Sequence, residues 1–362
     1  MSIPVHNVLN IDHDSLVNRK VLFGGTAYLA IPYNEKFKQL VFEGIDRYGI
    51  NYGASRNNNV SLDVFAMAEV EAAKRCGAEE SIIVSSGYLS AQLVIQHYFQ
   101  KYKFIYAPDT HPALWIGEPK PPIQSYREWT IQTVKEVNSS NQDVLLISNS
   151  LNNLFPEIYE FDWLKDILPG KKISFLVDDS HGIGITGKNG EGIYSSMPQI
   201  PHIETIVIAS MAKALGVDAG VILGTKTTID KLRTSPVYAG ASPPVPGVLY
   251  AYINAFAIYQ EELEKLRANI KFFTSLIEQT QGISYLTNFP VFLIDDANAG
   301  LNLASKGILI SSFAYPDPEG KALNRVVLNS GHSEEEMKGL AEALLGSKEQ
   351  GAKNKDSVSS DT

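Results

Sequence analysis

Short apolar runs alternate along the chain with longer segments whose apolar residues recur at helical spacing. The runs are rich in β-branched residues, which favours buried strands, and they occupy residues 82–84, 104–107, 144–148, 173–177, 206–209 and 220–224. Because helical patterns separate most of these runs, we predict an α/β fold with a mostly parallel central sheet. The helical patterns cover Glu35–Tyr48, Leu62–Cys76 and Val245–Ala268.

The pattern also divides the chain into parts. We predict an N-terminal segment (1–48), a large domain (49–265), a smaller C-terminal α+β domain (266–346) and a disordered tail (347–362), which is almost free of apolar residues. The elements expected in the smaller domain are strands at Val291–Ile294 and Gly307–Ile310 and a helix at Glu334–Leu345. Two stretches lack a regular pattern, and we expect irregular structure at Met1–Phe23 and a surface excursion between Trp115 and Asn141.

Polar residues with chemical potential follow two of the predicted strands. Asp178 comes directly after the run at 173–177, with His181 three residues on, and Ser210 and Lys213 follow the run at 206–209. Burial beside a core strand lowers the pKa of a lysine and leaves an amine able to form a Schiff base. A lone lysine in a loop is more often a surface residue. An acid and a histidine at the neighbouring strand end favour the chemical role, because pyridoxal phosphate needs a lysine and an acid at its ring nitrogen.

These residues carry a resemblance to a known family. The run Asp178-Asp-Ser-His181-Gly, followed by Ser210-Met-Ala-Lys213-Ala-Leu-Gly216, resembles the fold-type I pyridoxal phosphate enzymes. Among them the chain is similar to the α-oxoamine synthases, which include 8-amino-7-oxononanoate synthase, 2-amino-3-ketobutyrate CoA ligase and serine palmitoyltransferase. The resemblance implies pyridoxal 5′-phosphate as cofactor and a homodimer with its site at the subunit interface.

The resemblance also implies a role for each matching residue. Lys213 would hold the cofactor and move a proton, Asp178 would keep the ring nitrogen protonated, and the ring of His111 would stack on the cofactor. Gly87 and Tyr88 lie where a strand turns into a helix, which offers backbone N–H groups to a phosphate, although alone this is an ordinary turn. The implied catalytic residues are Lys213, Asp178, His181 and His111, and the implied cofactor contacts are Gly87, Tyr88, His111, Asn152, Asp178, His181, Ser210 and Lys213.

Arg325 is the implied substrate contact. It begins the run Arg325-Val-Val-Leu-Asn-Ser-Gly-His332, which matches a family strand whose arginine binds the carboxylate of the substrate. A guanidinium suits this task because it forms bidentate pairs with carboxylates. The alternative is an edge-strand arginine in a surface ion pair.

The chain departs from the family pattern at several positions. Asn152 stands in place of a serine that binds the cofactor, and Ala239–Ala241 replace hydroxyl residues that reach the phosphate of the neighbouring subunit. The other departures are Thr26, Val60 and Phe65, whereas Arg56 and Glu69 match the family. These differences leave three hypotheses open. The first is an acyltransferase that condenses an amino acid with an acyl thioester such as acyl-CoA. The second is an aminotransferase or lyase, and the third is a catalytically silent dimeric binding protein.

Composition limits the remaining possibilities. A chain of 362 residues can bury a large core, and its formal net charge of −9 argues against a nucleic-acid partner. The single cysteine, Cys76, suits a reducing compartment. No apolar run approaches the roughly 20 residues that a membrane helix needs. We therefore expect a soluble cytoplasmic enzyme that acts on a small-molecule amino acid.

Overall fold

The computed structural model describes residues 21–119, 121–152, 154–314, 320 and 322–345. These residues form two compact units, which are described separately. The large unit comprises Leu29–Asn152 and Glu157–Leu263, and the small unit takes the described residues of 1–28, 153–156 and 264–362. The predicted disordered tail lies outside the described residues.

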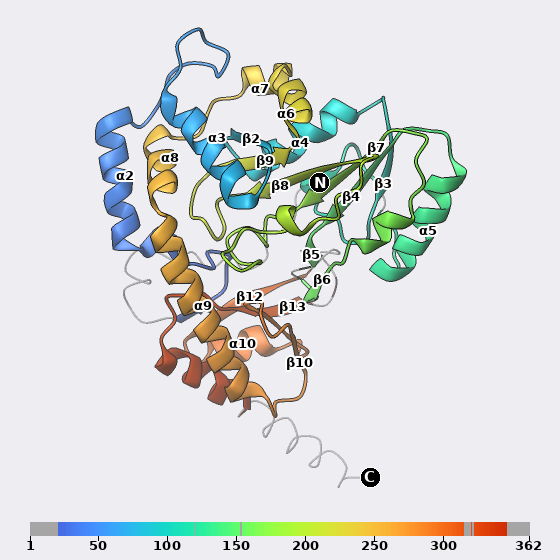
Figure 1. The fold of residues 1–362 in the computed structure, drawn as a ribbon. Helices are drawn as coiled ribbons and strands as arrows, with labels where there is room; N and C mark the ends of the chain where they lie inside the picture. The colour runs from blue at the N-terminus through green and yellow to red at the C-terminus, as the bar shows by residue number, and fades with distance from the viewer. Residues whose placement is uncertain (1–20, 120, 153, 315–319, 321, 346–362) are drawn as a thin grey trace. The chain divides into compact units, whose positions relative to one another are not determined.

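A six-stranded sheet forms the centre of the large unit (Figure 1). Strands β3, β4, β7 and β8 pair in parallel, and β9 runs antiparallel to both of its neighbours, β8 and β2. In spatial order the strands are β2 (Glu80–Val84), β9 (Gly220–Gly224), β8 (Ile203–Ser210), β7 (Ile173–Asp178), β4 (Val144–Asn149) and β3 (Lys103–Tyr106). The predicted mostly parallel sheet is confirmed, and the reversed strand is β9.

Helices cover this sheet because its strands are apolar on both faces; all residues of β7 and β9 are buried. Helices α2, α3 and α8 lie together at the end of the sheet near β2, and α5 lies near β3 and β4 at the other end (Figure 1). The helices are α2 (Glu35–Tyr48), α3 (Asp63–Cys76), α4 (Gly87–Tyr98), α5 (Tyr126–Ser139), α6 (Lys226–Arg233), α7 (Pro236–Gly240), α8 (Pro246–Asn254) and α9 (Phe256–Ile277). A short hairpin joins β5 (Leu151–Asn152) to β6 (Glu157–Ile158).

Helix α5 corrects the predicted surface excursion between Trp115 and Asn141. Ser125 and Glu128 form a capping box at its start, each side chain accepting the other's backbone N–H. The buried face has helical spacing, but it includes two threonines among its members, which are Tyr126, Trp129, Thr130, Thr133 and Val137. A search for apolar periodicity therefore misses the helix, because hydroxyl residues complete its buried face.

The helix predicted over Val245–Ala268 is interrupted at Ala255, which separates α8 from α9. In a continuous helix the carbonyl groups of Tyr252 and Ile253 would accept N–H groups from the next turn. Instead, Nη2 of Arg75 donates to both carbonyl oxygens, at 3.0 and 3.1 Å. The side chain of a distant helix thus takes the hydrogen bonds that would have continued α8.

The small unit contains a five-stranded sheet in the order β1 (Val21–Phe23), β12 (Ile308–Ala314), β13 (Ala322–Val327), β11 (Val291–Ile294) and β10 (Ile283–Tyr285). Strand β1 pairs in parallel with β12, so the irregular structure predicted for Met1–Phe23 is wrong at its last three residues. A strand this short gives no periodicity to detect. Helix α10 (Ala299–Ala304) and a helix at residues 334–345 complete the unit. Within the described ranges, no helix has both the length and the apolar character that crossing a bilayer requires.

A buried ion-pair network connects three segments of the large unit. The carboxylate of Glu69 binds Nη2 of Arg56 at 2.8 Å and Nη2 of Arg233 at 3.1 Å, and it also accepts the backbone N–H of Ile83. The side chains of Glu69 and Arg56 are 7% and 8% exposed. The Arg56 guanidinium lies 4.7 Å from the ring centre of Phe65, which is one of the departures from the family pattern.

We predict that Glu69→Gln lowers the free energy of unfolding of the large unit by about 3–5 kcal/mol, because it leaves the buried Arg56 without its counter-charge, whereas Arg233 keeps Glu80 and Asp230. Chemical denaturation followed by tryptophan fluorescence measures this change. Glu43→Gln, an exposed position on α2, is the matched control and is expected to leave stability unchanged. Equal denaturation midpoints for the two variants would contradict the prediction.

Candidate active site

Polar residues gather where the parallel strands of the large unit end. The register of the sheet places Asn149, the last residue of β4, opposite Asp178, the last residue of β7. Ser210 ends β8, and Lys213 follows it in the connection to β9. The carboxyl ends of parallel strands form the edge at which α/β proteins bind ligands. The structure therefore brings the residues of the two sequence motifs to one edge.

A chain of hydrogen bonds fixes the turn after β7. The carboxylate of Asp178, 9% exposed, accepts the backbone N–H of Ser180 at 2.9 Å. The Ser180 hydroxyl in turn accepts the backbone N–H of Ser210 at 2.8 Å. This serine couples the ends of β7 and β8, and the half-buried His181 follows it directly in the same turn. Ser180 was not among the site residues predicted from the sequence, although it lies between Asp178 and His181.

Lys213 is half-buried, and its environment favours the neutral amine. Burial lowers the pKa of its ammonium group, and the nearby Asp178 carboxylate opposes this effect without cancelling it. A lysine with a lowered pKa is a better nucleophile at neutral pH because more of it is unprotonated. The amine is thus prepared for attack on a carbonyl group.

His111 lies within electrostatic reach of both residues. Burial lowers its pKa, as does Lys213, while Asp178 raises it. Its ring Nδ1 accepts the backbone N–H of Ala113 at 3.1 Å, so the neutral ring carries its proton on Nε2. The backbone N–H of His111 donates to Oδ1 of Asn149 at 3.3 Å. A neutral, anchored imidazole therefore stands at the edge that Asp178 and Lys213 share.

The predicted phosphate turn lies at the start of α4. Ser86 caps the helix by accepting the N–H of Leu89, and the N–H groups of the first residues, Gly87 and Tyr88, have no carbonyl partner inside the helix. A Cβ on Gly87 would lie 2.5 Å from Cβ of Ser210, so only glycine lets the helix start approach β8 this closely. The Tyr88 side chain is 64% exposed, which leaves its backbone N–H as the group suited to a phosphate.

Asn152, which replaces a family serine, is 5% exposed and donates from Nδ2 to Oδ2 of Asp109 at 3.1 Å. Burial raises the pKa of Asp109. The backbone of Asp109 has a positive φ of 54° and its carbonyl oxygen accepts Nδ2 of Asn149 at 2.7 Å. Asn149 and Asp109, two residues that hold the His111 loop, were not among the site residues predicted from the sequence.

The remaining departures have local explanations in the large unit. Phe65 is fully buried beneath the Arg56 guanidinium, whereas Val60 is 67% exposed. The carbonyl oxygen of Ala239 accepts the hydroxyl of Ser55 at 2.6 Å. The loop of Arg56 is therefore joined to the segment Ala239–Ala241, which has lost its side-chain hydroxyls.

Arg325 belongs to the small unit, where it lies on β13, between β12 and β11. It is 6% exposed, and its guanidinium is 5.2 Å from the ring centre of Phe313. The alternative interpretation of Arg325 as an edge-strand residue in a surface ion pair is wrong, because β13 is an interior strand. Burial lowers the pKa of Arg325, and the nearby Tyr28 opposes this effect.

The large-unit residues fit pyridoxal phosphate. Its aldehyde needs an amine of lowered pKa, its ring nitrogen needs a buried carboxylate, and its phosphate needs N–H donors. Lys213, Asp178 and the start of α4 supply these groups at one edge. No cluster of three metal-ligating side chains occurs in the described part of the chain.

The opposing effects of burial and of Asp178 on the pKa of Lys213 lead to a prediction. The Asp178 carboxylate raises the lysine pKa, so Asp178→Asn should lower it further. The pH titration of ¹³C-dimethylated lysines by NMR, in cofactor-free protein, measures this shift. Asp218→Asn, an exposed acid in the same connection, is the control and should leave the Lys213 midpoint in place. An unchanged or raised midpoint in Asp178→Asn would refute this account.

The chain is similar to known proteins over most of its length. Residues 35–344 match the family described as aminotransferase class I and II. The 8-amino-7-oxononanoate synthase of Petrotoga mobilis is 26% identical over 329 residues, which cover 86% of this chain and 84% of the relative. The enzyme of the same name from Fervidobacterium nodosum is 25% identical over 332 residues, with the same two coverages of 86% and 84%.

The family match and the solved structures together confirm the fold class predicted from the sequence, a fold-type I transferase. Serine palmitoyltransferase of Sphingomonas wittichii superposes with a TM-score of 0.75 at 17% identity, covering 90% of this chain and 86% of its own. The 8-amino-7-oxononanoate synthase of Francisella tularensis gives a TM-score of 0.70 at 20% identity, with coverages of 92% and 99%. At these identities the likeness concerns the fold.

Proposed function

The chain belongs to the aminotransferase class I and II family of pyridoxal phosphate-dependent transferases, and we propose that it is an acyltransferase that condenses an amino acid with an acyl thioester. The observation that carries the cofactor chemistry is the half-buried Lys213 amine, whose pKa burial lowers, within electrostatic reach of the Asp178 carboxylate. The choice of acyl transfer is supported by the relatives named 8-amino-7-oxononanoate synthase, which align with 86% of the chain.

Bound pyridoxal phosphate supplies an electron sink for negative charge at the substrate's α-carbon. Lys213 would hold the cofactor and, as a neutral amine, take up and return a proton at that carbon. Asp178 would keep the ring nitrogen protonated, because a buried carboxylate gains from a neighbouring positive charge. The hydrogen bond from Ser180 holds this carboxylate in place.

The other residues would orient the cofactor. The backbone N–H groups of Gly87 and Tyr88, together with Ser210, would bind its phosphate, and His181 would contact a ring oxygen. His111 would stack on the ring in its neutral form, which burial favours. Asn152 would occupy the position of the family's serine as an amide donor.

Arg325 is proposed to bind the amino acid carboxylate. Its planar guanidinium suits a bidentate pair, and its burial would strengthen such a pair by excluding water. No other role in catalysis is assigned to the small unit.

A second candidate is an aminotransferase or lyase on the same cofactor. The absence of side-chain hydroxyls at Ala239–Ala241 favours it, because these positions differ from the acyltransferases that the chain resembles. A catalytically silent binding protein is less well supported, since a structural role does not require a buried lysine beside a buried acid.

We further propose a homodimer in the cytoplasm. Large apolar side chains on the large unit are exposed in the single chain, as expected of a surface that another subunit covers; they are Phe42, Ile50, Val60, Met67 and Val70. Cys76 is a free, buried thiol, and burial raises its pKa. Such a thiol suits a reducing compartment but does not require one.

The proposed role of Lys213 predicts that borohydride fixes the cofactor onto the wild type and not onto Lys213→Ala. Mass spectrometry of tryptic peptides would locate the added mass. Lys226→Ala, an exposed lysine of the same unit, should retain both labelling and the amino acid-dependent release of thiol from acyl-CoA. Labelling of Lys213→Ala at the wild-type level would overturn the assignment. Thiol release that no amino acid stimulates would favour the second candidate.

The proposed role of Arg325 predicts weaker amino acid binding in Arg325→Gln, by about 1.5–3 kcal/mol for the loss of a charge-assisted pair. Arg325→Lys should recover part of this loss, because a point charge cannot reproduce the fork. Spectral titration with amino acids measures the affinity, and a thermal melt of each variant is the control. A lower melting temperature with unchanged affinity would make Arg325 a structural residue.

A further inference from the structure

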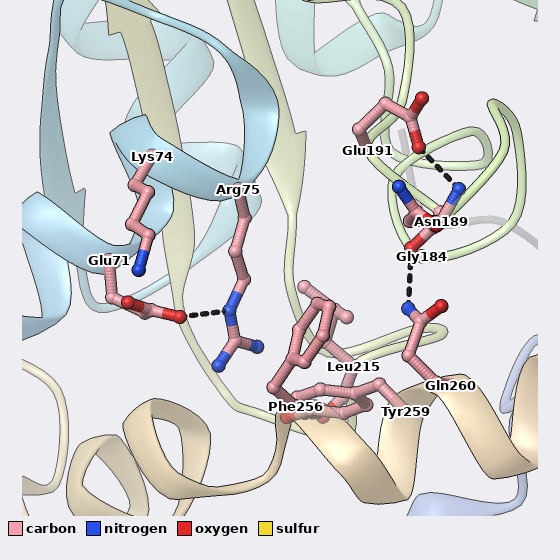
Figure 2. A pocket seen from close by; sticks show the side chains of 11 residues that line it. Glu71, Lys74, Arg75, Gly184, Asn189, Glu191, Leu215, Phe256, Tyr259 and Gln260 are labelled. Carbon is pink, nitrogen blue, oxygen red and sulfur yellow. Dashed lines mark hydrogen bonds and ion pairs between the residues drawn. The ribbon is translucent and has the colours of Figure 1, made fainter.

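A pocket on the large unit is lined by residues that have no role in the proposed function (Figure 2). Its volume is about 420 Å³, which falls within the range of small-molecule sites. Helix α3 contributes Lys74 and Arg75 on one side, and the turns around Gly184 and Glu191 form the opposite side (Figure 2). The apolar side chains of Leu215, Phe256 and Tyr259 lie between them.

The cationic side of the pocket has hydrogen-bonding capacity to spare. Arg75 gives Nε to the Glu71 carboxylate at 2.7 Å and Nη2 to two backbone carbonyl groups. Its Nη1 is buried and has no hydrogen-bond acceptor in the described part of the chain. Lys74 is exposed at the pocket and forms no ion pair with any of the described residues. Both cations could therefore serve an anion.

The acidic residue on the opposite side of the pocket, Glu191, accepts hydrogen bonds from its own backbone turn. The two carboxylate oxygens of Glu191 accept the N–H groups of Lys188 at 3.1 Å and Asn189 at 2.6 Å. Gln260 donates to the carbonyl oxygen of Asn189 at 2.8 Å, which closes this wall (Figure 2). The acidic residue is thus hydrogen-bonded within its own turn, while across the pocket Nη1 of Arg75 has no acceptor and Lys74 forms no ion pair in the described part of the chain.

We propose that this pocket binds a small monocarboxylate with an alkyl or aryl body. The carboxylate would pair with Lys74 and with the remaining donor of Arg75, since a charged acceptor forms the stronger hydrogen bonds with both. The apolar body would cover Leu215, Tyr259 and Phe256, whose ring is 49% exposed without a ligand.

The pocket shares its walls with the loops that carry the proposed catalytic residues. Leu215 follows Lys213 in the chain, and its carbonyl oxygen accepts the hydroxyl of Tyr259 at 3.0 Å. Gly184 follows His181 in its turn and has a φ of 84°. A Cβ on Gly184 would lie 2.7 Å from Cβ of Ala214, so the two loops are in direct contact. A bound carboxylate would therefore restrain both loops, and this regulatory consequence rests on the proposed function.

Octanoate is a suitable probe because it combines one carboxylate with an apolar chain. Isothermal titration calorimetry of the purified protein should give saturable binding of octanoate and none of octylamine. Lys74→Glu should weaken octanoate binding by about tenfold, because it replaces attraction by repulsion. Lys101→Glu, at an exposed lysine outside the pocket, is the matched control and should bind like the wild type.

Phe256→Ala provides an independent test of the apolar contact, with a thermal melt to verify that the variant is folded. It should weaken octanoate binding while leaving the preference for octanoate over octylamine. The proposal is overturned if octanoate does not bind saturably, if octylamine binds equally well, or if Lys74→Glu binds like Lys101→Glu. Binding is measured as heat without turnover, so a protein that binds octanoate but no cofactor would refute the proposed function and leave this site standing.

Discussion

The balance between burial and charge at Lys213 is the constraint on which the candidate site depends. Burial alone would favour a neutral amine, which has no ionic attraction to a carboxylate. A strong ion pair would instead keep the amine protonated and unreactive. The structure avoids both outcomes because Asp178 gives part of its hydrogen-bonding capacity to the backbone of Ser180. This hydrogen bond fixes the Asp178 carboxylate, while burial still lowers the lysine pKa.

The fold was predictable wherever one segment determines its own structure. The apolar runs predicted the sheet of the large unit, and α2 has the bounds that its pattern and Gly49 indicated. The reversed direction of β9 was not predictable, because an apolar run does not indicate in which direction its strand crosses the sheet. Helix α5 was missed since Thr130 and Thr133 complete its buried face, and the break at Ala255 depends on Arg75, which is distant in the sequence.

The same distinction applies to the candidate site. Asp178, His181 and Lys213 could be found from the sequence because each follows an apolar run within a few residues. Asn149 and Asp109 could not be found in this way, because they act through hydrogen bonds between distant parts of the chain. The side chain of Asn149 accepts the backbone N–H of His111 and donates to the backbone carbonyl of Asp109. The candidate catalytic residues can thus be recognised from neighbouring residues in the sequence, whereas the residues that position them are recognised only from their hydrogen bonds in the folded structure.

Arg75 shows how one side chain can create both a fold feature and a binding surface. Its guanidinium ends α8 by taking two carbonyl oxygens, and it lies 4.6 Å from the ring centre of Tyr252 and 5.5 Å from that of Phe256. Helix α9 begins at Phe256 as a separate helix. The positions of the Phe256 and Tyr259 side chains are therefore set by the axis of α9 and not by a continuation of α8. Arg75 therefore contacts both the break between the two helices and the apolar side of the pocket, and its Nη1 keeps no acceptor in the described part of the chain.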